Sequence, residues 1–167
     1  YLLNGDFPLD SWKPGDVVTT NDPQLCAGHK PDVGVVSPIF HKNKIIGFIG
    51  TISHVPDIGG VLWGAGARDA YEEGLLIPPT KLYSEGVQNE TLISLIENNV
   101  RAPMQTIGDI RAQIAANDQG RKGLISLMDE VELDDISALA DQIIAASEKA
   151  MRDAISKAPD GTFRYSY

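Results

Sequence analysis

Two histidines and an aspartate in this chain have the side chains and the spacing of a metal site. His29 and Asp32 lie three residues apart in NDPQLCAGHKPD, and His54 lies in ISHVPDIGG. Imidazole and carboxylate ligands together suit divalent manganese, iron or zinc. An ion held by three ligands keeps positions for water or a substrate carbonyl, so it acts as a Lewis acid or activates the water. The ordinary alternatives are hydrogen-bonding histidines and a turn aspartate.

Four further side chains are candidates for the same site. Asp22 is a candidate metal ligand, and Asp57 is either a further ligand or a catalytic carboxylate that orients the imidazoles. Glu73, in YEEGLLIPP, is the candidate general base, with a surface carboxylate as its alternative. Cys26 is either a small buried residue or, less in keeping with its context, a thiol ligand or nucleophile.

The elements that must position these residues are predicted strands of a β-hairpin. Segments 33–40 and 45–53 are rich in β-branched and aromatic residues, and the polar residues HKNK separate them. A further short strand is predicted at 17–20. Because the candidate ligands stand just before and just after the hairpin, a paired hairpin brings them together.

The register of this hairpin decides whether Asp32 and His54 meet. A three-residue loop that pairs His41 with Ile45 places Asp32 directly opposite His54. A two-residue turn at Lys42–Asn43 shifts the pairing by one residue and turns the two side chains to opposite faces. The sequence leaves both registers open.

The second half of the chain has helical rather than strand periodicity. Asn89 is a predicted cap for the segment ETLISLIENNV, and Pro103 is predicted to open a second helix. Asp134 or Asp135 caps a third helix, whose apolar stripe predicts packing against the second helix or a partner. The fold class is therefore α+β: a β-rich part at 1–88, a helical part at 89–158 and the start of a further strand at 159–167.

The composition excludes several classes of function. The 167 residues are enough for one domain with a core, and a net charge of −9 argues against nucleic acid or an anionic membrane as partner. The one cysteine fits a reducing cytoplasm. The run IGGVLWGAG lacks the features of a phosphate loop, so we expect ATP to be bound elsewhere. Its Gly59 and Gly60 are predicted to allow a sharp turn and a close approach to another backbone.

Longer motifs in the chain resemble the hydantoinase B/oxoprolinase family. They are KPGDVVTTNDPQLCAGHKPDVGVVSPIF, GFIGTISHVPDIGG, YEEGLLIPPTKLY and NNVRAPMQTIGDIRAQIAAN, in that order. The resemblance implies a catalytic subunit of several hundred residues, of which this chain is an internal portion. It also implies an ATP-binding partner of the hydantoinase A type. In the acetone carboxylases of this family the metal is manganese, and its ligands correspond to His29, Asp32 and His54.

The resemblance leaves the reaction open. One possibility is ATP-dependent hydrolysis of a cyclic amide such as a hydantoin or 5-oxoproline, and another is ATP-dependent carboxylation of a ketone. A third is a non-catalytic assembly module. Many members have two adjacent histidines where this chain has Ser53 and His54, a form closer to the aryl-ketone carboxylase branch.

Overall fold

The computed structural model describes residues 5–61 and 66–166. Residues 62–65 of the glycine run lie outside the described residues. By its internal contacts the chain divides into two units, residues 1–127 and 128–167, and each is described by itself. Among the described residues, no helix is both long enough and apolar enough to cross a membrane.

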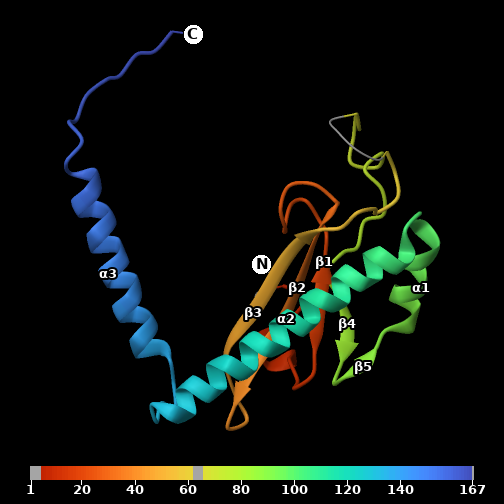
Figure 1. The fold of residues 1–167 in the computed structure, drawn as a ribbon, viewed down its shortest axis with the longest axis horizontal. Coiled ribbons are helices and arrows are strands. Elements are labelled where there is room, and N and C mark those ends of the chain that lie inside the picture. The colour runs from red at the N-terminus through yellow and green to blue at the C-terminus, as the bar shows by residue number, and fades with distance from the viewer. Residues whose placement is uncertain (1–4, 62–65, 167) are drawn as a thin grey trace. The chain divides into compact units, whose positions relative to one another are not determined.

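The first unit is built on a five-stranded sheet with the order β3-β2-β1-β4-β5 (Figure 1). All neighbouring strands are antiparallel. The strands are β1 (Val17–Thr20), β2 (Asp32–His41), β3 (Lys44–His54), β4 (Thr80–Ser84) and β5 (Val87–Gln88). The predicted α+β class and the first three strands are confirmed, whereas β4 and β5 were not predicted because each is too short to show a clear alternation.

The hairpin of β2 and β3 combines the two registers that the sequence left open. Its turn has two residues, Lys42 and Asn43, both with positive φ (48° and 64°), as the tight hairpin turn requires. His41 therefore pairs with Lys44, and the predicted pairing of His41 with Ile45 is wrong. A bulge between Ile39 and Phe40 then shifts the register by one residue, so that Asp32 still lies opposite His54.

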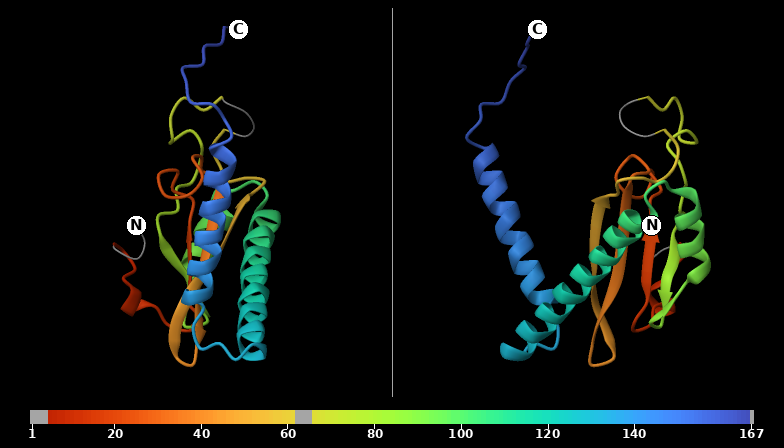
Figure 2. Two further views of the ribbon diagram at one scale, coloured as in Figure 1. Left: turned by 90° about the vertical axis from the view of Figure 1, so that its left-hand side faces the viewer. Right: turned by 45° about the vertical axis from the view of Figure 1, so that its right-hand side comes forward.

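Helices α1 (Glu90–Asn99) and α2 (Pro103–Glu130) follow the sheet. The Asn89 side chain caps α1 by accepting a hydrogen bond from Leu92 N at 3.0 Å, and Pro103 opens α2, both as predicted. Helix α2 runs across one face of the sheet (Figure 2), where Asn117 donates to the carbonyl of Val35 at 3.1 Å. The core between sheet and helices consists mainly of valine, isoleucine and leucine: Val17, Val33, Val35, Val55, Ile58, Ile77, Leu82, Leu92, Ile93, Ile96, Ile107 and Ile110.

The second unit consists mainly of helix α3 (Ser137–Ile155). Asp135 accepts hydrogen bonds from the backbone and the hydroxyl of Ser137, close to the predicted cap. No residue of α3 is buried, so the packing partner predicted for its apolar stripe stays a prediction. Residues 162–166 form no strand, because none of the described segments pairs with them, and the predicted start of a strand at 159–167 is not seen there.

Candidate functional site

His29, Asp32 and His54 lie together at the open end of the β2–β3 hairpin. His29 Nε2 is 2.7 Å from Asp32 Oδ2, and the rings of His29 and His54 have centroids 5.2 Å apart at an interplanar angle of 61°. Asp32 and His54 are direct cross-strand partners. The side chain of His29 is 44% exposed and that of Asp32 is 18% exposed, so the cluster is accessible to a solute.

The loop that carries His29 is fixed by a residue that sequence reasoning missed, Asn21. Its side chain is fully buried and joins three segments: Nδ2 donates to the carbonyls of Lys30 (2.8 Å) and Leu75 (2.9 Å), and Oδ1 accepts from Ile77 N (2.6 Å). Buried polar groups need such partners, and here the partners are all backbone groups. Asn21 directly follows the buried strand β1, which is the only signal the sequence offers.

Lys30, the residue after His29, is a second anchor that sequence reasoning missed. It is 4% exposed, its Nζ donates to the carbonyl of Gly74 at 2.8 Å, and its backbone N–H donates to Glu73 Oε2 at 3.0 Å. The exposed ring of Tyr71 lies 5.8 Å from Lys30 Nζ. Glu73, the predicted general base, therefore binds the backbone of the loop that carries His29.

Asp57 is buried and forms an ion pair with Arg101, whose guanidinium lies 3.1 Å from Oδ1. Its carboxylate also accepts from the backbone N–H groups of Gly59 and Arg101. Burial acts to raise the pKa of Asp57, but these hydrogen bonds and the charge of Arg101 outweigh it and hold the pKa below its ordinary value. Both oxygens of Asp57 thus serve to hold the turn that follows His54.

The turn after Asp57 makes the close backbone approach that was predicted for it. Gly59 and Gly60 have positive φ (81° and 63°), and a Cβ on Gly59 would lie 2.7 Å from the carbonyl oxygen of Asn99. A Cβ on Gly60 would overlap the carbonyl oxygen of Glu72. Side chains are therefore excluded at both positions.

Asp22 and Cys26 lie in the loop before His29. Asp22 Oδ1 accepts from Gln24 N at 2.9 Å, a turn interaction, and among the described residues no hydrogen bond or ion pair joins Asp22 to the three clustered residues. Burial, and after it the charge of Asp32, raises the pKa of the half-buried Cys26 thiol. A raised pKa keeps the thiol protonated at neutral pH, which favours the interpretation of Cys26 as a small packed residue.

The cluster has the donor chemistry of a divalent-metal site. Two imidazoles and one carboxylate supply the mixed nitrogen and oxygen set that manganese, iron and zinc accept. Within the part of the chain that the structure describes, no group of three or more His, Cys, Asp or Glu side chains is arranged to hold an ion as it stands. The cluster instead has His29 and Asp32 hydrogen-bonded to each other, with His54 beside them, so the residues fit a cation in kind and in proximity.

Comparison with known proteins identifies the family. The sequence profile of the Hydantoinase B/oxoprolinase family matches residues 4–167. The chain belongs to this family. A component of an enzyme named "Putative D-/L-hydantoinase" from Pseudomonas sp. (strain NS671) is 40% identical over 158 residues, which is 92% of this chain and 27% of that protein.

Two solved structures of related proteins share the fold of this hydantoinase B-type chain. The ATP-dependent caprolactamase from Pseudomonas jessenii is 33% identical, with a TM-score of 0.82 over 91% of this chain and 27% of that chain. The nucleotide-free acetone carboxylase structure is 25% identical, with a TM-score of 0.66 over 75% of this chain and 16% of that chain. The chain thus spans about a quarter of the length of the first curated relatives that it matches.

Proposed function

We propose that this chain is part of the catalytic subunit of an ATP-dependent cyclic-amide hydrolase. In this proposal His29, Asp32 and His54 hold a divalent metal ion, and ATP is bound by a partner of the hydantoinase A type. The observation that carries the proposal is the convergence of these three side chains at one accessible end of the hairpin. The names of the relatives support the substrate class, because hydantoins and caprolactam are cyclic amides.

The three residues have distinct parts in this proposal. Asp32 accepts from His29 Nε2 and so fixes the orientation of the ring, while His54 reaches the same place from the opposite strand. A bound divalent ion supplies Lewis-acid polarisation of an amide carbonyl. The buried anchors Asn21 and Lys30 keep the His29 loop at a fixed place relative to the hairpin. The catalytic roles suggested for Asp57 and Glu73 and the ligand role suggested for Asp22 stay predictions.

A ketone carboxylase is the second candidate. The acetone carboxylase structure shares the fold at 25% identity, and Ser53 stands where many family members have a further histidine. Both reactions pass through negative charge on a carbonyl oxygen, so the same cluster can serve either. A requirement for bicarbonate in the complete enzyme would select the carboxylase.

Metal content of variants in the full-length protein tests the site. We expect His29→Ala and His54→Ala each to lose bound manganese, measured by elemental analysis and by titration with manganese alone. His41→Gln is the matched control, because it changes the third histidine of the chain, at the other end of the same hairpin. Full metal occupancy in His54→Ala would show that the assignment is wrong. With the ATP-binding partner present, ATP-dependent opening of a cyclic amide without bicarbonate would support the hydrolase over the carboxylase.

A further inference from the structure

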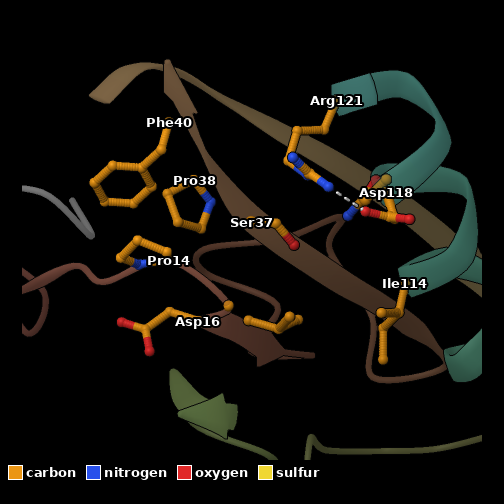
Figure 3. A pocket seen from close by; sticks show the side chains of 11 residues that line it. Pro14, Asp16, Ser37, Pro38, Phe40, Ile114, Asp118 and Arg121 are labelled. Atoms are coloured by element: carbon orange, nitrogen blue, oxygen red, sulfur yellow. Dashed lines mark hydrogen bonds and ion pairs between the residues drawn. The ribbon is translucent and has the colours of Figure 1, made fainter. Parts of the chain in front are cut away.

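A cavity of about 370 Å³ lies between helix α2 and strands β1 and β2. Figure 3 shows Ile114, Asp118 and Arg121 of the helix on one side, Pro14, Pro38 and Phe40 on the other, and Ser37 between them. The volume is within the range of small-molecule sites, and the walls are mainly apolar with a few polar groups. Its lining begins five residues along β2 from Asp32, roughly 17 Å at the usual rise of a strand, so it is separate from the histidine cluster.

One buried acceptor in the lining of this cavity is unmatched. Asn117 is fully buried and lines the cavity, and its Nδ2 donates to the carbonyl of Val35 at 3.1 Å. Its Oδ1 has no hydrogen-bond partner among the described residues. Buried side-chain oxygens nearly always have a partner, because losing hydration without one costs free energy. The acceptor is therefore suited to an N–H or O–H donor from outside the chain.

The charges around the cavity favour a neutral ligand. Arg121 and Lys122 both pair with Asp118, at 2.7 Å and 2.6 Å, so neither Asp118 oxygen lacks a partner. The guanidinium of Arg121 has five N–H donors, more than its bond to Asp118 uses. The carboxylates of Asp16 and Asp118 oppose an anion, and Arg121 opposes a cation. What the lining offers is one acceptor, Asn117 Oδ1, and spare donors on Arg121, four residues later on the same face of the helix.

We propose that this cavity binds a neutral secondary amide with a hydrocarbon substituent. The amide N–H donates to Asn117 Oδ1, and the amide carbonyl accepts from the guanidinium of Arg121. The hydrocarbon part packs on Pro14, Pro38 and Phe40. The amide belongs either to a small molecule or to the backbone of a peptide segment, and both offer the same donor and acceptor. Binding here does not depend on the histidine cluster or on a metal.

Paired probes test the proposal in the full-length protein by calorimetry and by soaking crystals. N-butylacetamide presents the donor and the acceptor, whereas butyl acetate keeps the shape and the carbonyl but lacks the N–H. We expect the amide to bind about tenfold more tightly than the ester, the value of one good hydrogen bond. A capped alanine dipeptide distinguishes the sources: binding of the dipeptide alone indicates a protein segment, and binding of N-butylacetamide indicates a small-molecule site.

Two helix variants provide the control. Arg121→Met removes the donor that lines the cavity, and Lys122→Met removes the neighbouring cation that also pairs with Asp118 but does not line it. We expect Arg121→Met to weaken amide binding about tenfold and Lys122→Met to leave it unchanged. Both positions are on the helix surface, so both variants should fold. Equal binding of amide and ester, equal effects of the two variants, or a water on Asn117 Oδ1 that saturating amide does not displace would each overturn the proposal.

Discussion

The helices of the first unit and helix α3 use the same apolar residue types with opposite results. In α1 and α2, Ile96 and Ile110 are at most 1% exposed and pack in the core. In α3, Ile144 and Ile155 are each 63% exposed, and no residue of the helix is buried. Both regions show isoleucine and leucine at helical spacing, yet only the first has a sheet to cover them.

This difference separates two things that periodicity is often taken to predict together. The repeat of apolar residues predicts that a segment is helical and that one face is apolar. It does not predict which surface covers that face, because the covering surface comes from distant parts of a chain or from another chain. The second unit therefore has well-formed helical structure while contributing little burial to the free energy of unfolding.

Matched isoleucine substitutions test this contrast and should have the largest effect. We expect Ile110→Ala to lower the free energy of unfolding by about 3 kcal/mol, because it leaves a cavity beneath α2. Ile144→Ala removes the same atoms from an exposed position of α3 and should change it by less than about 0.5 kcal/mol. Chemical denaturation of the two variants measures both values. A large loss for Ile144→Ala in the full-length protein would show that α3 is covered there.

The second prediction concerns polar burial in the first unit. Asn21→Ala should cost about 2 kcal/mol, because it leaves the carbonyls of Lys30 and Leu75 and the N–H of Ile77 without their partners. Asn98→Ala is the control, since the Asn98 side chain makes only exposed bonds to Ser94 on the same helix. Denaturation gives the cost, and the NMR signals of the His29 ring report whether the loop has moved. Unchanged stability together with unchanged His29 signals would remove Asn21 from the support of the site.

Local patterns predicted the hairpin of the first unit well. Alternation and β-branched residues marked β2 and β3, and the pairing of Asp32 with His54 followed from one of two registers that were considered. The structure keeps that pairing with the other turn, because the bulge at Ile39 and Phe40 adds one residue to a strand. Nothing in the sequence at 39–40 marks a bulge, since bulges depend on the twist and packing of the whole sheet.

Contacts between distant segments could not be predicted in the same way. Asn21 bonds to residues more than fifty positions away, and Asp57 meets Arg101 across forty-four positions. Their partners are backbone groups or long side chains that many residue types could supply, so no spacing rule identifies them. The candidate ligands were easier to find, because histidine is rare in this chain and two of its three histidines stand at the same end of one hairpin.

Acid should weaken the first unit through its buried ion pair. Burial acts to raise the pKa of Asp16, but hydrogen bonds from Lys81 and from the backbone of Glu85 and Lys13 outweigh it, so the pKa lies below its ordinary value. A carboxyl whose pKa is lower in the folded state stabilises the fold above its unfolded pKa. That stability is lost as pH falls through the folded pKa.

Asp16→Asn should therefore be less stable than the original chain by about 1 kcal/mol at neutral pH. The gap should close in acid below the usual aspartate range, as measured by denaturation over a pH series. Asp118→Asn is the control, because the pKa of Asp118 is also lowered by Lys122 and Arg121 but its side chain is 39% exposed. A pH-dependent gap of equal size for both variants would contradict the assignment to the buried pair.

The smallest effects compare one helix cap from each unit. Asn89→Ala should cost about 1 kcal/mol, because its side chain caps α1 through Leu92 N and the core beneath α1 makes that helix part of the global unfolding step. Asp135→Ala removes the bonds to Ser137 at the start of α3, and should cost less than about 0.5 kcal/mol globally because α3 buries nothing. Hydrogen exchange should show faster exchange in the first turn of α3 in Asp135→Ala, with the sheet unchanged. Asn89→Asp, which keeps a capping oxygen, should restore most of the loss at α1, and equal global losses for the two alanine variants would mean that both helices are held by comparable packing.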